Sequence, residues 1–196
     1  MLGVDGRVHG ATRAGGSHAS STYPHGQGTL WAVSLDGTYE SLHDFAGGED
    51  GRQPTGDLAL APQGAIVGIV RRDFDQEAIF HLGPRGLRVT TSWYVGDPVG
   101  GGSATAGLAV AKDGTLYGTT VAFSTYGHGA LFRVRPGGRP EVIHAFGDTS
   151  VDGQRGDSTP LLLSGNVLVG PTHFGGTSGV GAGYLVELAP ASGRPR

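Results

Sequence analysis

The residues of this chain best suited to chemistry are histidines in glycine-rich segments. His25, His128 and His173 stand in three such segments, and Tyr126 lies close to His128. Imidazoles that titrate near neutral pH act as general acids and bases or ligate metals, so these four residues are the candidate catalytic groups. We expect no metal site, because no H-x-x-H or H-E-x-x-H spacing occurs and nothing marks a carboxylate partner. The alternative is that these segments are only polar surface.

A second set of side chains could bind a ligand without reacting with it. This set comprises His18, Tyr23, Arg71, Arg72, Asp73, His9 and Tyr117. His9 and Tyr117 occupy equivalent positions in two of the strand-like runs, and the other two runs have valine there. These two polar side chains could line the wall between blades or the central channel, or they could lie in the core with a hydrogen-bond partner. His43 and His144 are also equivalent to each other, and we expect them to be structural residues at the edge of a sheet.

Composition limits the partners and cofactors. The net charge of −3 and the pI near 6.2 give no broad electrostatic attraction for nucleic acid. No apolar run approaches the length of a membrane helix, and no cysteine is present to form a disulfide. The chain has no P-loop and no G-x-S-x-G elbow, so we expect no cofactor; calcium at the acidic GGEDG and SVDGQRGD segments is an alternative. The N-terminus has no secretory signal pattern, which predicts a cytoplasmic protein or a fragment.

The elements that position these side chains are short strands in a repeat. Glycines at positions 10, 68, 118 and 170 occupy the same place in four similar runs spaced by roughly 50 residues, a spacing typical of blades or arrays. Each unit shows runs of four to six apolar residues bounded by Gly, Pro, Asp or Asn, which predicts strands. The third strands are predicted to start at Gly28, Glu77, Gly129 and Gly183, and the fourth strands to end at Phe45, Tyr94 and Phe146. The last unit has no fourth strand.

These strands predict an all-β fold. Asp-Gly and Gly-Gly pairs between successive runs favour hairpin turns, and four antiparallel strands per repeat indicate a β-propeller-like array of about 3.5–4 blades. One repeat domain is expected over residues 1–190, with blades at about 1–56, 57–106, 107–159 and 160–188 and a tail at 189–196. Short turns should lie at one end of the sheets and long loops at the other. The candidate side chains would then share the long-loop face.

One pattern carries a family resemblance. The run D-G-x-L-Y-G-T-T, a glycine-rich gap, G-x-L-F-R-V, then VIHAF and DG, all within residues 113–160, resembles the Gloeobacter/Verrucomicrobium-type ("GloVer") tandem repeat. Residues 5–58 match well, whereas residues 63–106 depart because RRDFDQ replaces the Gly-Gly gap. The resemblance implies repeated blades and an exported bacterial protein, and it implies little about activity. Some propellers with related short repeats are linked with cyclisation steps in natural-product pathways.

Three functions remain open from the sequence. The first is a binding or interaction scaffold whose long-loop face holds a small molecule, a glycan or a protein. The second is a cofactor-independent lyase, isomerase or cyclase that uses histidine and tyrosine on that face. The third is a structural repeat module. Because so few blades do not close a ring easily, we expect a homodimer or a partner subunit, although a fragment and a compact four-bladed monomer are alternatives.

Overall fold

The described residues fold into strands, turns and loops, apart from two short 3-10 turns at Gly48–Asp50 and Pro62–Gly64. The structure is a computed structural model that describes residues 1–72, 76–94, 104, 107–122, 124–149, 152–156, 162–164, 167–177, 179 and 181–187. Every strand pairing in this part of the chain is antiparallel. The all-β prediction is confirmed. None of the described helical segments has the length and apolarity needed to cross a membrane.

The strands form four successive sheets and one small ribbon. Sheet 1 contains β1 (Val8–Thr12), β2 (Thr29–Val33) and β3 (Tyr39–Asp44). Sheet 2 contains β4 (Arg52–Leu60), β5 (Ile66–Arg71), β6 (Gln76–Gly83) and β7 (Gly86–Tyr94). Sheet 3 contains β8 (Ala109–Val110), β9 (Leu116–Thr119), β10 (Ala130–Val134) and β11 (Pro140–Ala145). Sheet 4 contains β13 (Leu162–Ser164), β14 (Val167–Thr172) and β16 (Ala182–Glu187), and β12 (Gly153–Gln154) pairs with β15 (Phe174–Gly175) in the ribbon.

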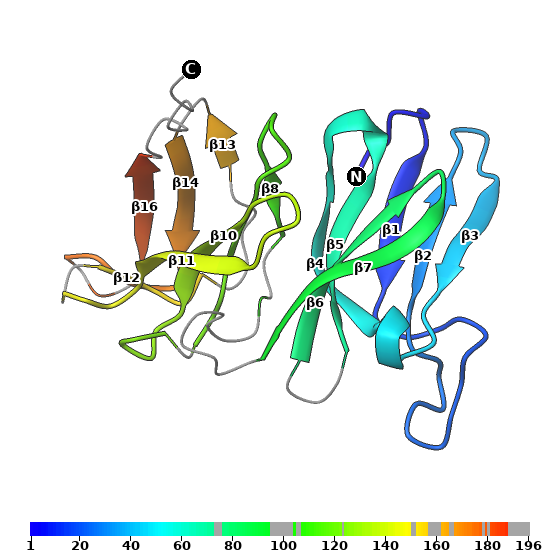
Figure 1. Cartoon of the computed structure of the whole chain (residues 1–196), viewed down its shortest axis with the longest axis horizontal. Coiled ribbons are helices and arrows are strands. Elements are labelled where there is room, and N and C mark those ends of the chain that lie inside the picture. Colours follow the sequence, from blue (N-terminus) through cyan, green and yellow to red (C-terminus); the bar gives the residue numbers. More distant parts are fainter. Residues whose placement is uncertain are drawn as a thin grey trace.

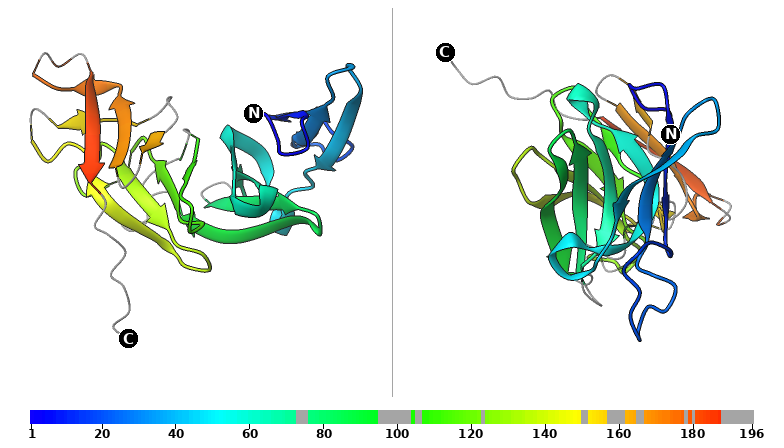
Figure 2. Two further views of the ribbon diagram at one scale, coloured as in Figure 1. Left: turned by 90° about the horizontal axis from the view of Figure 1, so that it is seen from above. Right: turned by 90° about the vertical axis from the view of Figure 1, so that its right-hand side faces the viewer.

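The four sheets follow one another along an arc, which stays open between sheet 1 and sheet 4 (Figures 1 and 2). Strand β4 contacts β1 and β8, and β8 contacts β13, so neighbouring sheets meet along one series of strands. In sheet 1, the residues before β1 form a single bridge, between Leu2 and Val8. The described residues form no closed ring, so the propeller remains a proposal.

The repeated glycine has a packing reason. Gly68 is paired with Phe80 and Gly118 with Phe132 on the neighbouring strand. The aromatic ring lies across the glycine, so that a Cβ added at Gly118 would lie 2.5 Å from the Phe132 ring, and one at Gly68 would lie 2.6 Å from the Phe80 ring. Gly10 with Trp31 and Gly170 with Tyr184 repeat the arrangement. The glycine therefore sets how deeply the ring enters the space between sheets.

The hydrophobic core is divided among the interfaces between successive sheets. Strand alternation sends Phe80 toward sheet 1 and Ile79 toward sheet 3. Each interface contains an aromatic pair: Phe45 with Phe80 at 5.7 Å between ring centroids, Trp93 with Phe132 at 5.6 Å, and Phe146 with Tyr184 at 5.4 Å. Burial of these rings against one another is a major stabilising term for the array.

Strand β7 ends at Tyr94 as predicted, and β16 begins at Ala182, one residue before the predicted Gly183. The alignment of these two strands with the other sheets is wrong, however. The residue equivalent to Phe45 and Phe146 in sheet 2 is the buried Trp93, not Tyr94, because Glu77 pairs with Trp93. In sheet 4, Gly170 pairs with Tyr184, so GAGYLV from Gly181, and not the run from Gly183, is the counterpart of GALFRV. In both cases the aromatic that faces the neighbouring sheet fixes the register, and apolar runs alone do not identify it.

His43 and His144 each contact an aspartate in the segment that leads to the next sheet. The His43 Nε2 atom lies 2.9 Å from Asp50 Oδ1, and the His144 Nε2 atom lies 3.1 Å from Asp152 Oδ1. Each aspartate also accepts a backbone N–H, from Ala46 at 2.8 Å and from Gly147 at 2.7 Å. These contacts agree with the structural role expected for both histidines.

Candidate ligand site between sheet 2 and sheet 3

The long loops lie at one end of the sheets and the short turns at the other, as expected from antiparallel order (Figure 1). In the loop between β1 and β2, His18 and His25 are exposed and Tyr23 is half-buried. Tyr23 stacks with Arg52, whose guanidinium carbon lies 5.4 Å from the ring centroid. Arg52 also donates to the backbone oxygen of Arg72 at 2.6 Å. Tyr23 and Arg72 therefore participate in packing between sheets 1 and 2.

The candidate catalytic residues belong to loops of three different sheets. His25 precedes β2, His128 precedes β10, and His173 lies between β14 and β15. His25, His173 and Tyr126 are exposed, whereas His128 is half-buried beneath Gly147 and accepts a hydrogen bond from the Arg155 amide at its backbone oxygen. The described residues contain no group of three or more His, Asp or Glu side chains placed to hold a metal ion.

The remaining predicted residues are divided between core and surface. Tyr117 is 7% exposed and packs with Phe146 and Leu168 between sheets 3 and 4; burial, and then the charge of Asp113, raise its pKa. His9 is 5% exposed, and its Nε2 atom lies 2.9 Å from Asp5 Oδ1. Arg71 is half-buried at the end of β5. Asp73 lies outside the described residues.

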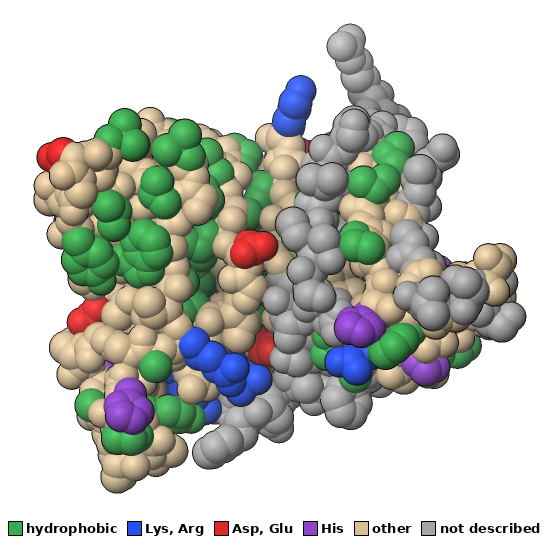
Figure 3. Space-filling view, turned by 180° about the vertical axis from the view of Figure 1, so that it is seen from behind, with side chains coloured by type: hydrophobic (Ala, Val, Ile, Leu, Met, Phe, Trp, Pro, Cys, Tyr) green, Lys and Arg blue, Asp and Glu red, His purple; other side chains and the backbone are tan. Residues whose placement is uncertain are grey.

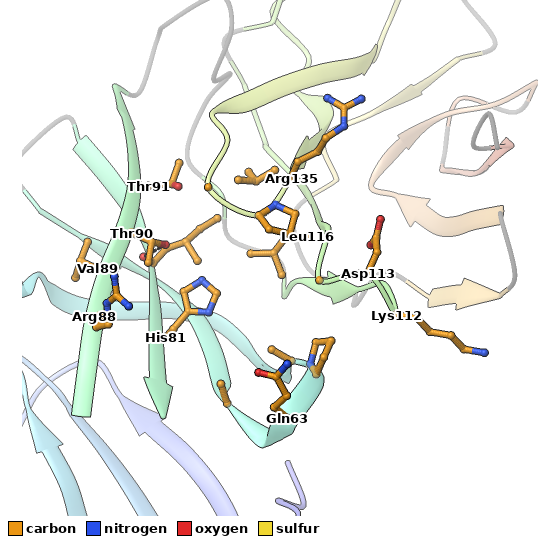
Figure 4. Close-up of a pocket in the computed structure, with 18 residues that line it drawn as sticks. Gln63, His81, Arg88, Val89, Thr90, Thr91, Lys112, Asp113, Leu116 and Arg135 are labelled. Carbon is orange, nitrogen blue, oxygen red and sulfur yellow. Dashed lines mark hydrogen bonds between the residues drawn. The ribbon is translucent and has the colours of Figure 1, made fainter. Parts of the chain in front are cut away.

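A cavity of about 700 Å³ opens at the opposite, short-turn end, between sheet 2 and sheet 3 (Figure 4). We call it the wedge. Its floor is apolar and is formed by the buried side chains of Ile79, Leu116 and Val134. Its rim consists of the turns 61–65, 112–114 and 135–137. A register shift between Ile79 and Phe80 leaves Thr90 as an extra residue of β7, and this bulge places Thr90 in the lining.

His81 and Arg88 provide the polar wall of the wedge on the sheet 2 side (Figure 4). They are cross-strand partners on β6 and β7, so both side chains face sheet 3 with Ile79. Burial, and then the positive charge of Arg88, lower the pKa of His81. His81 is therefore neutral at neutral pH, with one ring nitrogen that donates and one that accepts.

Arg88 is an exposed arginine that lines the wedge. The other arginines nearby on sheet 3, Arg133 and Arg135, both pair with Glu141, at 2.9 and 2.6 Å. In the part of the chain that the structure describes, Arg88 has no ion-pair partner. Lys112 also borders the wedge, but its side chain points away from it (Figure 4). Within the described residues, the wedge thus has the guanidinium of Arg88 without an ion pair beside an apolar floor.

Gln63 is the third polar group, and it lies on the turn between β4 and β5. Its φ of 69° is left-handed, a conformation that is rare for residues other than glycine and costs roughly 1–2 kcal/mol. Backbone strain of this kind concentrates at functional positions. In Figure 4 its side chain extends toward the space in front of His81. Gln63, His81 and Arg88 can together hold an anionic or hydrogen-bonding group at the mouth of the wedge.

The sequence reasoning placed the site at the long loops and missed the wedge. A signal was present in the run EAIFHL, because His81 occupies a core-facing position where Ala32 stands in sheet 1. A polar residue at such a position needs a partner or a cavity. The distance between the two sheets decides whether His81 meets a partner or a cavity, and no short motif encodes that distance.

The comparison with known proteins identifies the repeat. A family model described as the Gloeobacter/Verrucomicrobia repeat matches residues 1–184. No curated protein matches the chain. The match extends over all four sheets and agrees with the resemblance seen in the sequence pattern. The chain therefore belongs to the Gloeobacter/Verrucomicrobia repeat family.

Proposed function

We propose that this protein is a binding scaffold built of β-propeller-like blades, and that the wedge receives a small organic carboxylate with an apolar body. The observation that carries the proposal is the guanidinium of Arg88, which forms no ion pair within the described residues, beside the apolar floor of Ile79, Leu116 and Val134. A carboxylate would accept charge-assisted hydrogen bonds from this side chain. The apolar body of the ligand would cover the floor.

The other polar groups suit the same ligand class. The neutral ring of His81 can donate one hydrogen bond to a carboxylate without requiring a proton from solution. The Gln63 amide supplies further donors at the rim. The rim also carries the carboxylate of Asp113, which accepts a hydrogen bond from the backbone N–H of Thr115 at 2.9 Å.

An enzyme that uses the loop histidines is the alternative. The Arg155 amide donates to the backbone oxygen of His128, and the His173 amide donates to the backbone oxygen of Arg155, so two of the three candidate loops lie side by side. Binding by the long-loop face stays a separate prediction. We propose that the four sheets act as consecutive blades, since each buries an aromatic pair against its neighbour.

Titration with phenylacetate, followed by NMR of the side-chain nitrogens, tests the proposal. We expect saturable shifts at His81 and at the guanidinium of Arg88. Because hydrogen bonds to charged groups contribute about 1.5–3 kcal/mol, Arg88→Gln should weaken binding by roughly 10- to 100-fold.

The matched control is Arg85→Gln, because Arg85 is exposed in the neighbouring turn and does not line the wedge. This variant should bind phenylacetate as the unmodified protein does. Phenylacetamide, which keeps the apolar body and removes the charge, should bind more weakly. Equal losses in the Arg85 and Arg88 variants, or equal binding of acid and amide, would contradict the proposal.

A further inference from the structure

Within the described residues, no sheet packs on one face of sheet 1, although the equivalent face of the other sheets is covered by the preceding sheet. Two residues before the repeated glycine, the chain has Val8, Ile66, Leu116 and Leu168 in the four sheets. Ile66, Leu116 and Leu168 are 6%, 4% and 0% exposed, whereas Val8 is 42% exposed. Leu116 and Leu168 share buried clusters with residues of the preceding sheet. The position is apolar in all four sheets, but only in sheet 1 is its side chain exposed to solvent.

The aromatic position shows the same contrast. Phe80 and Phe132 are 0% and 1% exposed under an aromatic ring of the preceding sheet. Trp31, their counterpart, is only half-buried and lies against Tyr39 of its own sheet, with 6.5 Å between the ring centroids. Tyr39 is 59% exposed and Leu2 is 65% exposed. Figure 3 shows hydrophobic side chains gathered over this part of the molecule.

Within the residues that the structure describes, no sheet follows sheet 4 at the other end of the arc. One residue before the repeated glycine, Val67 is 0% exposed and Tyr117 is 7% exposed, each covered by the following sheet. Val67 shares a buried cluster with Leu116, and Tyr117 shares one with Leu168. The equivalent residue in sheet 4, Val169, is half-buried.

We infer that two copies of this chain associate head to tail, with sheet 4 of one copy packed on sheet 1 of the other. This contact would resemble the one between sheets 2 and 3, where Val67 and Leu116 share a buried cluster. Val169 would take the place of Val67, and Val8 of the second copy would take the place of Leu116. Both open faces lie at the two ends of one arc (Figure 2). Two arcs related by a two-fold axis would bring together about eight sheets, within the range of β-propellers. The inference does not depend on what the wedge binds.

Engineered cysteines distinguish this arrangement from others, because the chain has no cysteine of its own. We expect that an oxidised mixture of Val8→Cys and Val169→Cys chains gives a disulfide-linked dimer on a non-reducing gel. Each variant oxidised alone should stay unlinked. Leu35→Cys, at a 90% exposed turn position, should not link to Val169→Cys. Linking of Val8→Cys chains to each other would show a head-to-head contact and overturn the inference.

Sedimentation velocity of the unmodified chain provides the second test. We expect the mass of a dimer, and we expect Val8→Asp to give the mass of a monomer with an unchanged far-UV circular dichroism spectrum. Val8 is already 42% exposed within one chain, so the substitution leaves the fold intact. Leu35→Asp is the control and should stay dimeric. A monomeric unmodified chain at the highest soluble concentration, or a Val8→Asp chain that stays dimeric, overturns the inference.

Discussion

Replacing Gly118 with alanine tests whether the repeated glycine is required for space rather than for backbone freedom. Gly118 lies within β9, and its φ is not in the left-handed region. An added Cβ would lie 2.5 Å from Cζ of Phe132 and 2.9 Å from Cδ2 of Leu108. Carbon atoms in favourable contact are about 3.5–4.0 Å apart, so the Phe132 ring must move by roughly 1 Å.

The Phe132 ring has little room to move. It is 1% exposed and packs against Trp93, with 5.6 Å between the ring centroids, in the core shared by sheets 2 and 3. Overpacking of a filled core costs typically 1–3 kcal/mol. For a protein of this length, 1 kcal/mol corresponds to a change in Tm of about 2–4 °C. We therefore expect Gly118→Ala to lower Tm by about 4–8 °C for a cost near 2 kcal/mol.

Thermal unfolding followed by circular dichroism measures this effect. Gly83→Ala is the matched control, since Gly83 also lies in a strand and the nearest atom to its added Cβ is 4.0 Å away. That variant should unfold within about 0.5 kcal/mol of the unmodified protein. Combining Gly118→Ala with Phe132→Leu should cost less than the sum of the single changes, because the smaller side chain leaves room for the methyl group. Equal Tm values for the two glycine variants, or additive losses in the double variant, would refute the steric explanation.

Three further predictions follow from the charges and backbone described above. Burial raises the pKa of Asp152, but hydrogen bonds from His144 and the amide of Gly147 outweigh this effect and hold the pKa below its usual value. The stability provided by the ionised Asp152 should be lost as pH falls from about 4. In urea unfolding, the free energy of unfolding of Asp152→Asn should therefore depend less on pH below about 4 than that of the unmodified protein. Burial lowers the pKa of His81, so the stability that the neutral ring provides should be lost as pH falls from about 6.5. NMR titration should place the midpoint of His81 below 6.5, and a midpoint at or above 6.5 would contradict burial as the cause. Gln63→Gly should raise the free energy of unfolding by about 1 kcal/mol, and a decrease would show that the left-handed backbone is not strained.

Much of the fold could be predicted from the sequence because the information is local. The Asp5-Gly6 and Asp113-Gly114 pairs each precede a strand, and both glycines have the positive φ that the turn requires, 74° and 84°. Four strands per repeat followed from the spacing of such pairs. What the sequence could not supply was the register in places where two adjacent residues were both suitable, as with Trp93 and Tyr94.

The candidate site could not be predicted in the same way. Loop length suggested the long-loop end, yet Tyr23 and Arg72 there contact Arg52 and help join two sheets. The wedge arises where the cores of sheets 2 and 3 end, and its lining residues come from β6, β7 and turns far apart in sequence. Residues brought together by the separation of two sheets leave no common spacing along the chain.

The division of the core into interfaces determines how the molecule should lose its structure. Each interior sheet is stabilised on both faces, by Phe45 and Phe80 on one side of sheet 2 and by Trp93 and Phe132 on the other, whereas the terminal sheets are stabilised on one. Stability in such an array is close to a sum of nearest-neighbour terms. Unfolding should then proceed inward from the ends, and amide hydrogens of β5 and β9 should exchange more slowly than those of β1. Cooperativity in this protein is a property of adjacent pairs of sheets rather than of the whole chain.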